Sequence, residues 1–103
     1  MAKLTLHWTK TALAQRNHIF SYWNKRNKSI EYSKRLLSVI NERTHIILSF
    51  PKIGREVENS QHFTIPLEHY SIFYKIVGAK IIITAFWDNN QNPKKLLKIL
   101  KEK

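Results

Sequence analysis

The pattern of apolar and polar positions predicts a short strand followed by two helices. Leu4, Leu6 and Trp8 alternate with polar residues, which is typical of a strand with one buried face. From residue 12 to about residue 27 the apolar positions recur with helical spacing, which predicts an amphipathic helix with Thr9 or Thr11 as its N-cap. The stripe of this helix consists of Ala12, Arg16, Ile19, Phe20 and Trp23.

A second helix is predicted from residue 29 to residue 50. Ser29 and Glu31 suit its beginning, because their side chains satisfy free N–H groups and complement the helix dipole. Pro51 favours an end at Phe50, since a proline disfavours helical geometry in the residue before it. The expected inner face contains Ser33, Leu36, Leu37, Ile40, Ile47 and Leu48.

The second half of the chain has the pattern of β-strands. After the polar segment 55–61, which we expect to be a loop, three strands are predicted at 62–67, 70–77 and 80–87, the last of them central and buried on both faces. Pro93 stands at the first position of a short basic C-terminal helix. The order β-α-α-β-β-β-α predicts an α+β fold in which a helical hairpin packs on a small, mostly antiparallel sheet.

The length and composition predict one folded unit. The chain has 103 residues, of which 43% are hydrophobic, so we expect a single domain over residues 1–103 and exclude a disordered polycation. No apolar run approaches the roughly 20 residues that a membrane helix needs, and the first residues do not have the pattern of a secretory signal. The sequence contains no cysteine, which is compatible with a reducing compartment, and we expect the protein in the cytoplasm.

The charge is strongly positive and unevenly distributed. Lysine and arginine number 18 against 7 acidic residues, a net charge of +11. Residues 1–49 carry +7 and residues 89–103 carry +4, whereas residues 50–88 are neutral. Such an excess is typical of proteins that bind nucleic acid, ribosomes or acidic proteins, although a single helix lysine is often only solvated. We expect Lys94, Lys95 and Lys98 of the C-terminal helix to bind a partner.

The candidate chemistry is limited to a few histidine and tyrosine side chains. His62 and His69 have no third ligand at a suitable spacing, so we expect no metal, and the sequence has no phosphate-binding glycine loop or other sign of a cofactor. His62, His69 and Tyr70 are candidates for acid–base cleavage of a phosphodiester. The alternative is that Glu68 and His69 form a hairpin tip and that the ring of Tyr70 packs at the sheet edge.

Several segments match a known family in their order and spacing. They are Leu6-His7-Trp8-Thr9 leading to Ala12, the Ile19 and Trp23 stripe, Phe50-Pro51-Lys52-Ile53-Gly54-Arg55, His69-Tyr70-Ser71-Ile72-Phe73-Tyr74-Lys75-Ile76, Ile81-Ile82-Ile83, and Phe86-Trp87-Asp88-Asn89 before Asn92-Pro93. With these segments the chain resembles, over nearly its whole length, the RelE/ParE superfamily of bacterial toxins from type II toxin–antitoxin systems.

The resemblance implies a growth-inhibiting toxin and a cognate antitoxin that neutralises it. A partly disordered segment of the antitoxin is expected to wrap the toxin. We expect that segment to be acidic and to cover the helix-facing side of the sheet together with the basic C-terminal helix. Some members of the superfamily cut mRNA on the ribosome, and others poison DNA gyrase without nuclease chemistry.

If the protein cuts RNA, the resemblance implies Arg55, Lys75 and Lys80 as the cations that bind the substrate. His62, His69 or Tyr70 would then supply acid–base groups, and the nucleophile would be the 2′-hydroxyl of the substrate.

The sequence also departs from the pattern of the RNA-cutting members. The strand 62–65 has no arginine, and Asn90 stands where similar sequences often have one. A developing phosphorane charge needs cations held in place, so this departure weakens the nuclease hypothesis. Three functions remain open: mRNA cleavage or interference with translation, inhibition of DNA gyrase without enzymatic activity, and a plain basic nucleic-acid-binding domain.

Overall fold

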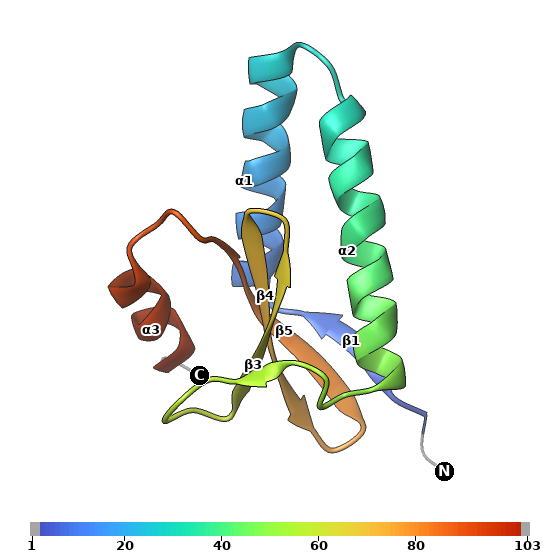
Figure 1. Ribbon diagram of the computed structural model, residues 1–103, viewed down its shortest axis with the longest axis vertical. Helices are drawn as coiled ribbons and strands as arrows, with labels where there is room; N and C mark the ends of the chain where they lie inside the picture. The colour runs from blue at the N-terminus through green and yellow to red at the C-terminus, as the bar shows by residue number, and fades with distance from the viewer. Residues whose placement is uncertain (1–2, 102–103) are drawn as a thin grey trace.

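The computed structural model describes residues 3–101 and shows one mixed sheet with helices on both of its faces (Figure 1). In chain order the elements are β1 (Thr5–Trp8), α1 (Lys10–Asn27), α2 (Glu31–Ser49), β2 (Arg55–Glu56), β3 (His62–Leu67), β4 (Tyr70–Val77), β5 (Lys80–Asp88) and α3 (Pro93–Lys101). The strands lie in the order β1-β5-β4-β3-β2, with β1 parallel to β5 and the other neighbours antiparallel. The predicted α+β fold is confirmed.

Local sequence explains where the helical hairpin begins and turns. The Thr9 hydroxyl accepts a hydrogen bond from the backbone N–H of Ala12 at 3.1 Å, which satisfies one of the free N–H groups at the start of α1. Lys28 follows the helix in a left-handed conformation, with φ of 53°. The chain then reverses, and α1 and α2 lie side by side and extend well beyond the strands (Figure 1).

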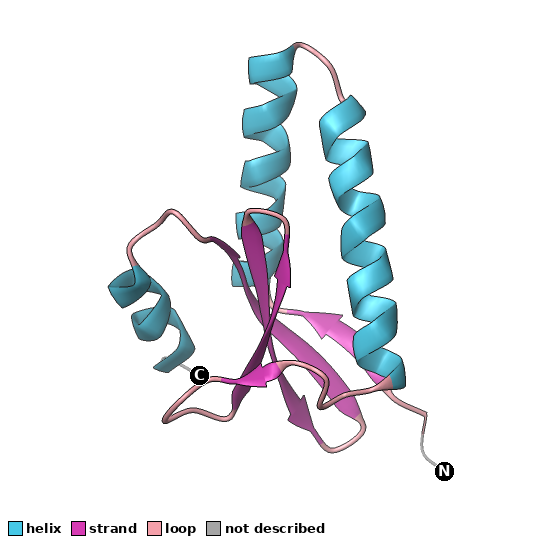
Figure 2. Ribbon diagram, in the orientation of Figure 1, coloured by secondary structure: helices cyan, strands magenta, loops and turns pink. Residues whose placement is uncertain are grey.

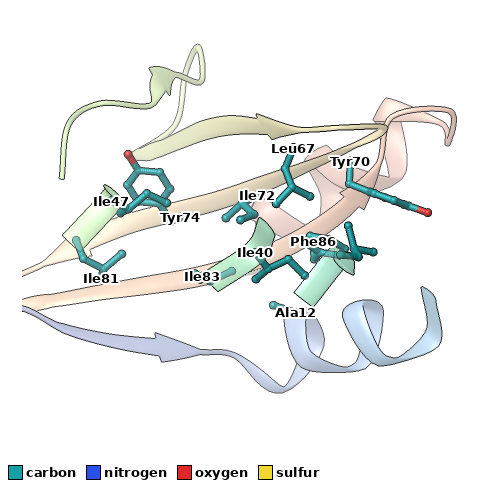
Figure 3. Packing of buried hydrophobic residues seen from close by; sticks show 11 residues of the cluster. Ala12, Ile40, Ile47, Leu67, Tyr70, Ile72, Tyr74, Ile81, Ile83 and Phe86 are labelled. Carbon is teal, nitrogen blue, oxygen red and sulfur yellow. The ribbon is translucent and has the colours of Figure 1, made fainter. Parts of the chain in front are cut away.

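The main core lies between this hairpin and one face of the sheet. Figure 3 shows side chains from α1, α2 and the central strands meeting there. Each large apolar side chain that is fully buried contributes roughly 1.5–3 kcal/mol relative to an exposed one. The buried members are Ala12, Leu36, Ile40, Ile47, Leu67, Tyr70, Ile72, Tyr74, Ile81, Ile83 and Phe86.

A smaller core lies on the opposite face of the sheet, beneath α3. Leu96 and Leu100 of α3 pack against Phe73, Ala85 and Trp87, and all five are at most 8% exposed. The strand β5, which lies inside the sheet between β1 and β4, is therefore buried on both faces, as the sequence predicted. Figure 2 shows α3 on the side of the strands away from α2.

The segment 55–61 differs from its prediction as a loop. Its first two residues, Arg55 and Glu56, pair with Thr64 and Phe63 and form the edge strand β2. A strand of two residues has too short an alternation of polar and apolar positions to be recognised from sequence.

Two expected surfaces are also corrected. Leu37 is 38% exposed, because Leu36 and Ile40 take the inward positions and Leu37 lies one step round the helix from Leu36. The helix-facing side of the sheet is filled by α1 and α2 of the same chain, so that an antitoxin cannot cover it as expected.

Candidate functional site

The three cations predicted to bind a substrate lie on one face of the sheet, the face that α3 partly covers. Residues opposite each other in antiparallel strands point to the same side. Arg55 lies opposite Thr64, which lies opposite Phe73 of the core beneath α3. Lys75 and Val77 are two and four positions beyond Phe73 on β4, so they point to the same side as Phe73. Lys80 of β5 pairs with Val77 and therefore lies on this face too.

His62 lies directly opposite Lys75 and is buried on the same face. It is 5% exposed, and within residues 3–101 neither Nδ1 nor Nε2 has a hydrogen-bond partner. Burial lowers the pKa of the imidazole, and the positive charge of Lys75 lowers that pKa further. At pH 7 His62 is therefore neutral, with one N–H donor and one acceptor nitrogen.

His62 and Lys75 line a groove of about 630 Å³, which we call the α3 groove. Its walls are the segment 57–61 on one side and Leu97 and Leu100 of α3 on the other, with Val57 adding apolar surface. This volume is typical of a site that takes a small ligand or a few residues of a peptide.

Tyr70 lies in the main core instead of at a reactive surface. It pairs with Leu67 beside the β3–β4 turn and is 4% exposed. Its hydroxyl accepts a hydrogen bond from Nε1 of Trp23 at 2.8 Å, and its ring stacks on Phe86 with 5.4 Å between centroids. These contacts explain why the residue that follows the tight turn is a buried tyrosine.

His69 lies in the β3–β4 turn, where its side chain is exposed. Glu68 precedes it with φ of 58°, so that these two residues form the hairpin tip. Five steps along β3, at roughly 3.3 Å each, place His62 about 17 Å from Leu67 at this end of the strand. The structure does not bring His62 together with His69 and Tyr70.

Lys94, Lys95 and Lys98 have exposed side chains on α3. The Oδ1 of Asn92 accepts a hydrogen bond from the backbone N–H of Lys94 at 2.9 Å and so caps this helix. Lys94 stands one turn before Leu97, on the same side of α3, which puts a positive charge beside the α3 groove.

The α3 groove is the part of the site that sequence reasoning missed. Two signals for it exist: Val57 is an isolated apolar residue in a polar segment, and α3 has an apolar Leu97 beside the buried Leu96 and Leu100. Neither signal says that the two segments meet, because their approach depends on how α3 docks against Trp87.

Within residues 3–101 the chain has neither a metal-binding cluster nor a membrane-spanning helix. No group of three or more histidine or acidic side chains there is placed to hold a metal ion. No helix in this part of the chain is long and apolar enough to cross a membrane.

The chain is similar to known proteins in both fold and sequence. A solved structure described as "Chromosomal ParDE TA system from P. aeruginosa" superposes with a TM-score of 0.74 at 21% sequence identity, covering 85% of this chain and 98% of that chain. No curated protein matches the chain. The sequence model of the family described as "ParE toxin of type II toxin-antitoxin system, parDE" matches residues 6–93. The chain therefore belongs to the family of ParE toxins of type II toxin–antitoxin systems.

Proposed function

We propose that this protein inhibits bacterial growth from the cytoplasm by binding a target protein, and that it does so without cutting RNA. The target that the family resemblance suggests is DNA gyrase. The observation that carries the proposal is the separation of the candidate acid–base groups. His62 is buried at one end of β3, whereas His69 is exposed at the other end and the hydroxyl of Tyr70 is engaged inside the core.

Cleavage through a 2′-hydroxyl needs an acid and a base that both reach the scissile phosphate. Each must come within hydrogen-bond distance of the proton that it moves, directly or through one water. A separation of about 17 Å along β3 is several times larger than that reach. Arg55, Lys75 and Lys80 remain able to bind a phosphate or an acidic protein surface, but cation binding alone does not cut RNA.

One observation favours the second candidate function, mRNA cleavage. Arg55, Lys75 and Lys80 share one face of the sheet with His62, which is the distribution of charge that a phosphate backbone requires. In that case an Arg55→Ala variant should relieve growth arrest, because it removes a cation from the phosphate-binding face.

The experiment that separates the two functions is induced expression in a bacterium without the antitoxin. DNA synthesis and protein synthesis are followed separately, and mRNA ends are mapped within minutes of induction. We expect DNA synthesis to stop first and no new mRNA ends to accumulate. New ends on ribosome-bound mRNA, with DNA synthesis continuing, would overturn the proposal in favour of RNA cleavage.

A further inference from the structure

The α3 groove contains a buried polar side chain that no residue described by the structure satisfies. Only 5% of His62 is exposed to solvent, and both ring nitrogens lack a hydrogen-bond partner among the described residues. Buried polar groups in folded proteins are nearly always hydrogen-bonded, so that an orphaned imidazole at the wall of a groove calls for a ligand. The ligand must bring a group that accepts or donates a hydrogen bond at this wall.

The charge beside His62 says which kind of group fits. Lys75 lies directly opposite His62, and no described side chain forms a salt bridge with it. Lys94 adds a second positive charge on α3. A carboxylate placed between His62 and Lys75 would accept hydrogen bonds from the imidazole N–H and from the ammonium group, and charge-assisted hydrogen bonds are the stronger ones.

The other walls of the groove distinguish a peptide from RNA. Val57, Leu97 and Leu100 are aliphatic, and the lining that the structure describes includes no Phe, Tyr or Trp on which a base could stack. Glu58 also lines the groove, where a peptide can offer it a backbone N–H and the phosphates of RNA cannot. The lining therefore suits an acidic residue that has an apolar neighbour.

We propose that the α3 groove is the docking site for an acidic segment of the antitoxin, which inserts a carboxylate between His62 and Lys75 and packs an apolar neighbour against Val57 and Leu97. The antitoxin is taken as the partner because the chain belongs to the ParE toxin family, and the proposal does not depend on which target the toxin inhibits. The groove lies on the face opposite α1 and α2, so the chain's own helical hairpin does not block it.

The test is a His62→Leu variant, for which the proposal predicts opposite effects on stability and on binding. Leucine removes two orphaned nitrogens, so that the melting temperature of the free protein should rise by about 4 °C. The same change removes the donor to the carboxylate, and the Kd for the antitoxin, measured by calorimetry, should rise by about tenfold or more. A purely structural role for His62 would not weaken binding while stabilising the fold.

Lys75→Met is the second variant, and His69→Leu is the matched control. Lys75 is only half-buried, so its replacement should leave the fold intact and still raise the Kd by about tenfold. His69 is exposed at the opposite end of β3, and its replacement should change the Kd by less than about twofold. A Kd that stays within this range for both His62→Leu and Lys75→Met would overturn the proposal.

Imidazole resonances of His62, observed by NMR, give an independent readout. They should shift when the antitoxin is added and stay unchanged with a short single-stranded RNA. A shift with the RNA and none with the antitoxin would overturn the proposal. Failure of the groove is distinct from failure of the proposed function, because growth arrest by the wild-type protein is measured without any antitoxin.

Discussion

Burying His62 without a hydrogen-bond partner costs the fold free energy, and it also makes stability depend on pH. The charged imidazolium is disfavoured first by burial and then by the positive charge of Lys75. The pKa of His62 in the folded protein therefore lies below the ordinary value of 6.5. Besides Lys75, the titratable group lining the same groove is Glu58. The sequence identified His62 as a candidate but could not show that its nitrogens are orphaned.

The sign of the pH effect follows from proton linkage. Above pH 6.5 the imidazole is mostly neutral in both the folded and the unfolded protein. As the pH falls below 6.5, the unfolded chain binds a proton that the folded chain does not, so the free energy of unfolding decreases until the pH reaches the folded pKa. Chemical denaturation at a series of pH values should show this decrease.

The contribution of His62 to this pH dependence is the difference between the profiles of the wild type and a His62→Leu variant. In His62→Leu the decrease below pH 6.5 should be smaller than in the wild type, whereas a His69→Leu control at the exposed turn should keep the wild-type decrease. Equal pH profiles for the wild type and His62→Leu would show that this imidazole does not carry the effect.

At the scale of elements, Tyr74 fastens the connection between α2 and β2 to the sheet. Its hydroxyl donates a hydrogen bond to the carbonyl of Pro51 at 2.8 Å and accepts one from the backbone N–H of Gly54 at 3.0 Å. Burial raises the pKa of this hydroxyl, so it stays protonated and able to donate. A side chain at position 54 would meet the Tyr74 hydroxyl oxygen at 2.8 Å and the carbonyl of Thr64 at 3.0 Å.

Gly54→Ala should therefore lower the free energy of unfolding by about 1–3 kcal/mol. Tyr74→Phe should cost a comparable amount, because it leaves the half-buried Gly54 N–H without its acceptor. In the Tyr74→Phe background the alanine has more room, so that Gly54→Ala should cost less there than in the wild type. Additive costs in this double-mutant cycle, measured by denaturant unfolding, would contradict the steric explanation.

The helices and the three long strands were predictable because each repeats its pattern over many residues. The signals that set these elements lie within or beside them in the sequence: Thr9 as the N-cap of α1, Pro51 after α2, and the apolar run of β5. The two-residue β2 and the α3 groove were not predictable, since both depend on which distant segments meet. For the same reason the sequence grouped His62 with His69 and Tyr70, and only the register of β3 and β4 separates them.

At the scale of the whole molecule, the net charge of +11 affects how fast the protein associates with its partners more than it affects the fold. Arg43–Glu42 is the single salt bridge among the described residues, so most cations are not neutralised within that part of the chain. A positive surface accelerates association with an acidic partner, and salt weakens this effect by screening.

The affinity for the antitoxin should therefore fall by about tenfold or more between roughly 50 and 500 mM salt. Replacing Lys94, Lys95 and Lys98 together by glutamine should make this dependence shallower. A matched triple change at Lys25, Arg26 and Lys28, at the far end of the helical hairpin, should preserve it. Calorimetry over a salt series measures both, and an affinity independent of salt would rule out a steering role for the charge.

The parallel pairing of β1 with β5 also has a consequence for how the toxin is made. Thr5 pairs with Lys80, so the first strand to leave the ribosome can join the sheet only after the last strand has followed it. Closing so long a stretch of chain costs entropy and favours slow, late completion of folding. A nascent chain thus has no complete sheet until β5 has been made, which delays the appearance of folded toxin in the cell that makes it.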